Sequence, residues 1–200
     1  MNSEPQFSDD EIKRYNELYQ QANRLIKDLV ILDNKPLKNP GFFEKLRLRK
    51  AIGLYLQALE VNPKSWQTMF FVAKAHQSLG EMEPMLTWLM RANEHAPGNP
   101  SVAKEIGFAA GRLGEHGVAI QVMESAAKQN PNDSALHTNL GLSCLMAGKA
   151  AEACWAFERT VQLEPARDIN KRLLALAREV QSGKRPAPKT ESEISAGIRS

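Results

Sequence analysis

Residues 135–165, ALHTNLGLSCLMAGKAAEACWAFERTVQLEP, decide the fold of this chain of 200 residues. Two apolar segments of helical length lie on either side of Gly148, and Pro165 follows the second segment. Glycine readily takes the left-handed conformation that ends a helix, and proline cannot continue a helix. This stretch therefore predicts two short helices joined by a tight turn.

The same pattern of glycine and proline residues recurs along the chain with a period of 34 residues. Four prolines share this spacing: Pro63, Pro97, Pro131 and Pro165. Three glycines share it too, each 17 residues before a proline: Gly80, Gly114 and Gly148. Small residues also keep the period: Ala73, Gly107 and Gly141. A fixed period of this length indicates repeated helix pairs, which the small residues allow to pack closely.

These columns resemble those of the tetratricopeptide repeat family, and residues 101–131, SVAKEIGFAAGRLGEHGVAIQVMESAAKQNP, form a second clear copy. The family's usual tryptophan column holds other residues here: Met69, Ala103 and His137. Its tyrosine column holds His76, Ala110 and Cys144. The resemblance covers residues 45–165 closely and 9–181 loosely. It implies an all-α fold, a right-handed superhelical solenoid of antiparallel helix pairs.

The expected organisation is one solenoid with an irregular beginning. Residues 1–8 are expected to be a flexible arm and 9–181 the solenoid, opened by a capping-box pattern from Ser8 to Glu11. Its expected parts are an irregular first repeat with a long N-terminal helix at 9–65, regular repeats at 66–99, 100–133 and 134–167, and a capping helix at 168–181. Residues 182–200 lack apolar periodicity and are expected to be a disordered tail.

Composition excludes several classes of protein. The chain has 26 basic and 23 acidic residues, a net charge of only +3, so no nucleic-acid partner is expected. No apolar run is long enough to span a membrane, so no membrane association is expected. Two cysteines form no disulfide framework, and the polar start MNSEPQFSDDE has no apolar signal region. We therefore expect a cytoplasmic protein.

The resemblance places a peptide-binding groove on the concave face, along the first helix of each repeat. The residues predicted to line it are Gln67, Phe70, Lys74, Gln77, Ser101, Lys104, Phe108, Arg112, Ala135, Thr138, Leu142, Leu145 and Met146. From the first repeat to the last, these groove residues change from aromatic and basic to apolar. Such a groove suits an extended or helical partner segment with apolar anchors and some acidic residues. The alternative is that Phe70, Phe108 and Leu142 pack between repeats or against the N-terminal helix.

One subclass of the family grips the carboxylate of a heat-shock chaperone tail with lysines, asparagines and an arginine. The matching positions here hold Phe70, Lys74, Glu105, Ala135 and Asn139. Because Glu105 would repel a carboxylate, this function is not expected.

Three tryptophans, Trp66, Trp88 and Trp155, are expected to be partly buried; Trp88 and Trp155 would be interface anchors if exposed. His76 and His137 fall on core columns, and Cys144 and Cys154 are expected to be reduced thiols in the core. No HExxH, phosphate-binding glycine loop or CxxC pair occurs. The sequence thus indicates no enzyme, no cofactor and no metal site.

The leading hypothesis is a protein–protein interaction module, acting as an adaptor or a chaperone-like subunit whose protein or peptide partner is unknown. A bacterial secretion chaperone is a narrower version. A second class is a self-associating structural subunit, with a homodimer formed through the N-terminal helix. A factor linked to RNA or DNA is the third class, which filter binding without salt-dependent retention would exclude.

Overall fold

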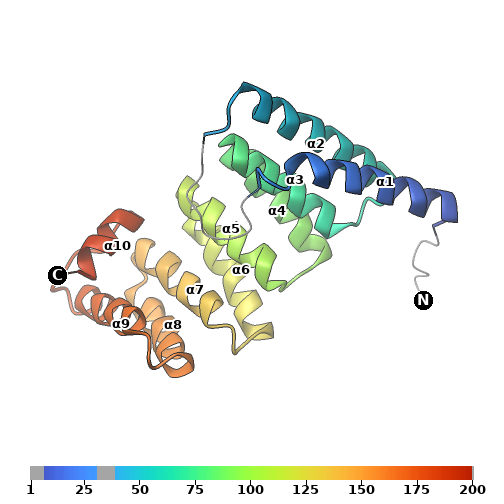
Figure 1. Ribbon diagram of the computed structural model, residues 1–200. Helices are drawn as coiled ribbons and strands as arrows, with labels where there is room; N and C mark the ends of the chain where they lie inside the picture. Colours follow the sequence, from blue (N-terminus) through green and yellow to red (C-terminus); the bar gives the residue numbers. More distant parts are fainter. Residues whose placement is uncertain (1–6, 31–38, 200) are drawn as a thin grey trace. The chain divides into compact units, whose positions relative to one another are not determined.

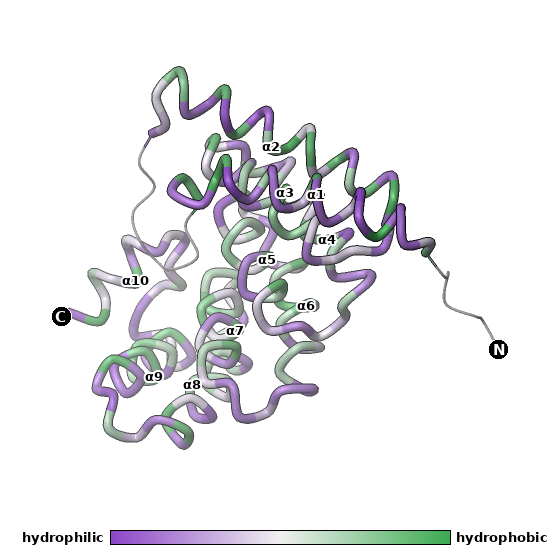
Figure 2. The backbone as a smooth tube through the Cα atoms, turned by 45° about the vertical axis from the view of Figure 1, so that its right-hand side comes forward, coloured by the Kyte–Doolittle hydropathy of each residue, from purple (hydrophilic) through white to green (hydrophobic). Residues whose placement is uncertain are grey.

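The computed structural model describes residues 7–30 and 39–199, and the regular structure in these residues is entirely helical (Figure 1). The prediction of an all-α fold is confirmed. The chain divides into two compact units, Met1–Ala96 and Pro97–Ser200, which are described separately. Hydrophobic and hydrophilic residues alternate along most helices, as expected for helices with one buried face (Figure 2).

The first unit contains four helices: α1 (Asp9–Ile26), α2 (Phe42–Val61), α3 (Trp66–Leu79) and α4 (Met82–His95). Helix α1 packs on α2 and α3 packs on α4, while α2 also contacts α3. Tyr55 of α2 lies fully buried at the centre, where its hydroxyl donates a hydrogen bond to Asn23 Oδ1 of α1 at 2.5 Å. This contact joins the two helices of the irregular first pair.

The second unit contains six helices: α5 (Pro100–Leu113), α6 (His116–Gln129), α7 (Ser134–Met146), α8 (Ala150–Leu163), α9 (Asp168–Gln181) and α10 (Glu191–Gly197). Helix pairs α5–α6 and α7–α8 pack internally, α6 contacts α7, and α9 packs on α8. Helix α5 also contacts α7, so the first helices of two consecutive pairs lie side by side. One apolar cluster, with Met123, Leu140, Phe157 and Leu173 among its buried members, extends from α6 to α10.

The repeated glycines and prolines act as predicted. Gly80, Gly114 and Gly148 have φ angles of 79°, 77° and 76°, the left-handed conformation that favours glycine. The repeated prolines each stand two residues after the end of a second helix: Pro63, Pro97, Pro131 and Pro165. The three helix pairs from α3 to α8 therefore have the same turn glycine and the same proline after the second helix.

Side-chain caps begin several helices. Ser8 and Glu11 form the predicted capping box at the start of α1. Ser65, Asn99 and Asp133 cap α3, α5 and α7 by accepting hydrogen bonds from backbone N–H groups of the first turn. These polar residues explain why the first helices begin where they do.

The end of the chain differs from the expected disordered tail, because residues 191–197 form helix α10. Ile194 is only 4% exposed and belongs to the apolar cluster of the second unit. A Cβ atom added at Gly197 would lie 3.0 Å from Leu176 Cδ1, so α10 lies directly against α9. Two isoleucines, Ile194 and Ile198, are too few to produce a periodic signal, but tertiary packing orders the segment. Residues 1–6 of the expected arm lie outside the described residues.

Candidate protein-interaction surfaces

In the second unit, seven of the predicted groove residues keep some exposure on α5 and α7. Ser101, Arg112 and Ala135 are exposed. The remaining four are partly buried: Lys104, Phe108, Thr138 and Leu142. Because α5 and α7 contact each other, these residues can contribute to one surface. We call this set of seven residues the α5–α7 surface.

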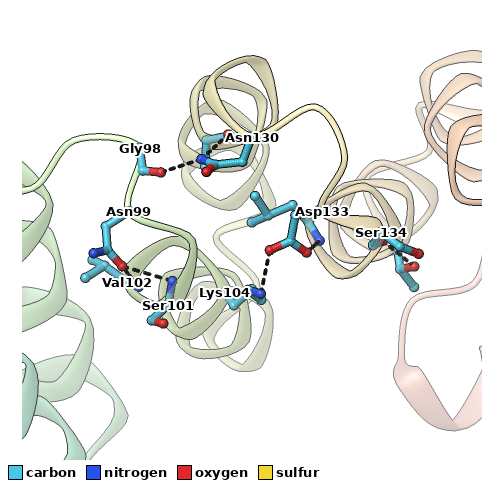
Figure 3. Close-up of polar contacts among 11 residues, drawn as sticks. Gly98, Asn99, Ser101, Val102, Lys104, Asn130, Asp133 and Ser134 are labelled. Atoms are coloured by element: carbon cyan, nitrogen blue, oxygen red, sulfur yellow. Dashed lines mark hydrogen bonds and ion pairs between the residues drawn. The ribbon is translucent and has the colours of Figure 1, made fainter. Parts of the chain in front are cut away.

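Lys104 of this surface forms an ion pair with Asp133 (Figure 3). Lys104 Nζ lies 2.8 Å from Asp133 Oδ2, while Asp133 Oδ1 accepts a hydrogen bond from the Leu136 N–H at 3.1 Å. Burial would raise the pKa of Asp133, but the hydrogen bonds from Lys104 and from backbone N–H groups outweigh it and lower the pKa. Asp133 therefore stays charged, caps α7 and ties α7 to α5.

Asparagine side chains hold the loops near this surface (Figure 3). Asn130 Nδ2 donates to the Gly98 carbonyl at 2.9 Å and to the Ala126 carbonyl at 3.0 Å. Asn99 Oδ1 accepts from the N–H groups of Ser101 and Val102. These bonds cap the start of α5 and join the loop before α5 to the end of α6.

Two predicted groove residues of the second unit, Leu145 and Met146, are buried. They belong to the apolar cluster that also contains Leu176 of α9 and Ile194 of α10. The helices that follow in the chain bury this end of α7, which corrects the prediction that both residues line a groove.

In the first unit, only two of the four predicted residues on α3 keep exposure. Gln67 is exposed and Phe70 is partly buried, with its ring against the edge of Phe71. Lys74 and Gln77 are 2% and 8% exposed, so neither offers a binding group at the surface. Ser78 Oγ donates to the Leu29 carbonyl at 2.9 Å. Leu29, just after α1, thus lies beside α3. The burial of Lys74 and Gln77 corrects the prediction that both residues line a groove.

The prediction of partial burial is correct for two of the three tryptophans and wrong for the third. Trp66 and Trp88 are partly buried as expected, and the guanidinium of Arg91 lies 4.7 Å from the Trp88 ring centre. Trp155 is 60% exposed, so its predicted burial is wrong. It lines a surface pocket of about 310 Å³ in the second unit, together with Glu124, Leu140, Cys144, Ala151 and Glu152. Sequence reasoning missed this pocket because helices α6, α7 and α8 all contribute to it.

A second surface that the sequence did not reveal is at the start of α2. Phe42, Phe43 and Leu46 are 77%, 76% and 60% exposed, and the two phenylalanine rings contact each other edge to face. Adjacent aromatic residues just after Gly41 were the signal for it. Exposed apolar groups of this size are typical of interaction surfaces.

Two cysteines and His137 lie in the core of the second unit. Cys144 and Cys154 are free and buried, as predicted. Burial and the nearby charges of Glu152 and Glu124 raise the pKa of the Cys144 thiol to about 11, so it stays protonated at neutral pH. His137 Nε2 donates to the Pro131 carbonyl at 3.1 Å, and its buried Nδ1 has no hydrogen-bond partner within residues 7–30 and 39–199.

In 7–30 and 39–199, no group of three or more histidine, cysteine, aspartate or glutamate side chains is arranged to hold a metal ion. None of the helices in those ranges is both long and apolar enough to cross a bilayer.

Comparisons with known proteins agree with this architecture. A family model described as tetratricopeptide repeat matches residues 105–168. The small glutamine-rich tetratricopeptide repeat-containing protein 2 of Mycosarcoma maydis is 25% identical over 107 residues, which are 54% of this chain and 30% of that protein. The chain therefore spans less than a third of the length of that relative.

Two solved structures share the fold. A crystal structure of MamA protein has a TM-score of 0.69 at 16% identity and covers 94% of this chain and 89% of its own. YrrB, described as a TPR protein with an unusual peptide-binding site, has a TM-score of 0.67 at 15% identity. The match covers 94% of this chain and 87% of the YrrB chain. At these identities the likeness concerns the fold.

Helix pairs with repeated turn glycines and a shared apolar core define a helical-repeat protein of the solenoid class. A model of the tetratricopeptide repeat matches residues 105–168, and YrrB, a solved tetratricopeptide repeat structure, shares the fold. Residues 105–168 are therefore similar to the tetratricopeptide repeat, and the chain has the fold of such proteins. Proteins of this family are interaction modules that bind protein or peptide partners.

Proposed function

We propose that this protein is a non-enzymatic adaptor or chaperone-like subunit that binds a peptide or helix of a partner protein on its α5–α7 surface. The observation that carries the proposal is the contact between α5 and α7, which brings apolar Phe108 and Leu142 and basic Arg112 onto two neighbouring first helices. Such a surface suits a segment with apolar anchors and acidic residues. Free, buried Cys144 and Cys154 favour a reducing compartment such as the cytoplasm.

Site-specific photo-crosslinking in the native cell tests this proposal. A photoreactive amino acid replaces Ser101 or Ala135, which are exposed on the α5–α7 surface, or the control residue Lys128, which is exposed on α6. We expect the same partner adduct from positions 101 and 135, identified by mass spectrometry, and none from position 128. Adducts from position 128 alone would contradict binding at α5 and α7.

A loss-of-function variant completes the test. Arg112→Glu reverses an exposed charge and should weaken capture of the crosslinked partner, whereas Arg172→Glu reverses an exposed charge on α9 and should not. Helix content measured by circular dichroism should stay unchanged in both variants. If wild type, Arg112→Glu and Arg172→Glu capture the partner equally, Arg112 does not belong to the proposed site.

A second candidate function, self-association as a structural subunit, is favoured by the exposed apolar residues Phe42, Phe43 and Leu46. Burying such side chains against a second copy would be favourable by about 1.5–3 kcal/mol each. Light scattering at two protein concentrations tests this function. The double variant Phe42→Ser with Phe43→Ser should abolish a dimer, whereas Thr87→Ala, at an exposed position of α4, should not. A wild-type protein that stays monomeric at both concentrations would exclude this function.

A further inference from the structure

The pocket beside Trp155 has an apolar floor and a charged rim. Leu140 and Cys144 of α7 are almost fully buried and form the floor. Exposed residues of the second helices α6 and α8 form the walls: Glu124, Ala151, Glu152 and Trp155. Its volume of about 310 Å³ is at the lower end of the range for ligand pockets, which suits one long side chain. The walls and opening of the pocket are on α6 and α8, whereas the residues of the α5–α7 surface are on first helices.

The Trp155 ring has one aromatic contact, with His137, and 60% of the residue's surface is exposed. The His137 ring contacts it at a centroid distance of 6.1 Å and an interplanar angle of 70°. Arg159, one turn further along α8, is engaged elsewhere, because its guanidinium donates to the Pro131 carbonyl and to Asn132 Oδ1. Trp88 of α4 shows the contrast, since its own Arg91 covers its ring. The indole of Trp155 is therefore available to a cation from outside.

The two carboxylates of the rim have no ion-pair partner among the residues that the structure describes. Other glutamates on or near α8 do have one: Glu158 pairs with Arg178 at 2.9 Å, and Glu164 pairs with Arg167 at 2.9 Å. The charges of Glu152 and Glu124 act on the pocket floor, because both help to raise the pKa of the Cys144 thiol, and the opposing effect of Lys149 is the smallest of the causes. The pocket thus combines a negative potential with apolar surface.

We propose that this pocket binds an arginine side chain of a partner protein, with the guanidinium on the Trp155 ring and between the carboxylates of Glu124 and Glu152. Arginine fits better than lysine because its flat, weakly hydrated guanidinium both stacks on indole and pairs with carboxylates. The methylene stem covers Leu140 and Ala151, which gives apolar contact that a small inorganic cation would lack. The site is independent of the proposed function of the α5–α7 surface.

A titration of the full-length protein followed by NMR tests the proposal. The probe is the peptide acetyl-Gly-Gly-Arg-Gly-Gly-amide, compared with the same peptide containing lysine, citrulline or norleucine in place of arginine. The indole N–H signal of Trp155 is assigned with Trp155→Phe. We expect a saturable shift of this signal with the arginine peptide in the millimolar range, as a single cation–π contact with two exposed carboxylates would give.

Matched variants identify the groups responsible. Glu124→Gln with Glu152→Gln should weaken binding of the arginine peptide about tenfold, since each exposed pair contributes modestly. Glu83→Gln with Glu94→Gln removes two exposed charges of the first unit and should leave the affinity unchanged. Circular dichroism of both double variants should match wild type, because all four side chains are exposed.

Several outcomes would overturn the proposal. Equal shifts with the citrulline peptide would show that charge is not recognised, and equal affinity for the lysine peptide would remove the preference for arginine. A Trp155 signal that does not move at tens of millimolar peptide would exclude the site. A shift that depends on protein concentration without any peptide would assign the pocket to a contact between copies of this chain.

Discussion

At the scale of single residues, the close approach of α7 and α8 depends on Gly141. A Cβ atom added at this position would lie 2.5 Å from Phe157 Cε1 and within 2.8 Å of two further ring atoms. Phe157 is fully buried, so the ring has little room to move. The small-residue column seen in the sequence therefore has a direct packing reason in this repeat.

We expect Gly141→Ala to lower the free energy of unfolding by about 1–3 kcal/mol because the added methyl group overlaps the Phe157 ring. Gly141→Leu should cost more. Gly111→Ala is the matched control, since a Cβ atom there meets nothing within 4 Å and alanine favours a helix by about 0.5–1 kcal/mol. Urea denaturation followed by circular dichroism measures both. Equal stability of the two variants would refute the steric explanation.

The ion pair of Lys104 and Asp133 makes a pH-dependent contribution. Because the folded protein lowers the pKa of Asp133, the stabilisation is present above the ordinary aspartate pKa of about 3.9 and is lost as pH falls through the folded value. Asp133→Asn keeps a side-chain oxygen for the cap of α7 but loses the ion pair. We expect it to reduce stability by about 0.5–1 kcal/mol at neutral pH, measured by urea denaturation.

Repeating this comparison of stabilities near pH 2 tests the direction of the pH dependence. Because protonation of Asp133 removes the ion pair, the difference between wild type and Asp133→Asn should shrink as the pH falls toward the lowered pKa of Asp133. A difference that stays constant between the two pH values would mean that the ion pair contributes nothing and that the asparagine simply caps α7 less well.

At the scale of elements, α10 shows that a short helix can exist through packing alone. It has seven residues, which is too short for stability in isolation. Thr190 caps its start by accepting a hydrogen bond from the Glu193 N–H at 3.2 Å, and Ile194 inserts into the apolar cluster of the second unit. Its order therefore depends on contacts with segments that come earlier in the chain.

Replacing Ile194 with aspartate should release α10 and leave the rest of the unit folded. Burying a charge in this apolar cluster is more costly than unfolding a seven-residue helix. Hydrogen exchange should show loss of protection at residues 191–197, with α7 and α9 unaffected. Ser195→Asp, on the exposed side of α10, is the control and should keep its protection. Unchanged protection in Ile194→Asp would show that α10 is held by other contacts.

At the scale of the whole molecule, the chain consists of two compact units, and each has an apolar cluster of its own. The cluster of the second unit runs from Ile120 to Ile194 and lies entirely within residues 97–200. A repeat protein is stabilised by contacts between neighbouring helix pairs, so a unit with several such contacts has what it needs to fold.

We expect a fragment of residues 97–200 to fold by itself, because its helix pairs bury their apolar faces against one another. Circular dichroism should show helix content and cooperative urea unfolding. Phe157→Ala in this fragment should lower stability by about 3–5 kcal/mol, which separates specific packing from helix propensity. A fragment that shows no cooperative transition would demonstrate that the second unit depends on the first.

Much of the fold could be predicted because it depends on local chemistry. Gly114 and Pro131 mark a turn and a helix end by backbone preferences that need no tertiary contact, and the period of 34 places every copy. The candidate surface could be predicted only in part. Ser101 and Ala135 keep the predicted exposure, whereas Lys74 and Met146 are buried, and no periodicity in the sequence reveals that burial.

The class of fold, the helix pairs and the positions of the core columns follow from the amino-acid sequence, because spacing and residue size act within one repeat. Which residues stay open to a partner depends on tertiary contacts. Leu29 meets Ser78, Ile194 joins the cluster around Leu176, and Glu124 and Trp155 line one pocket from different helices. Exposure depends on such contacts between distant parts of the chain, and a repeat pattern carries no information about them.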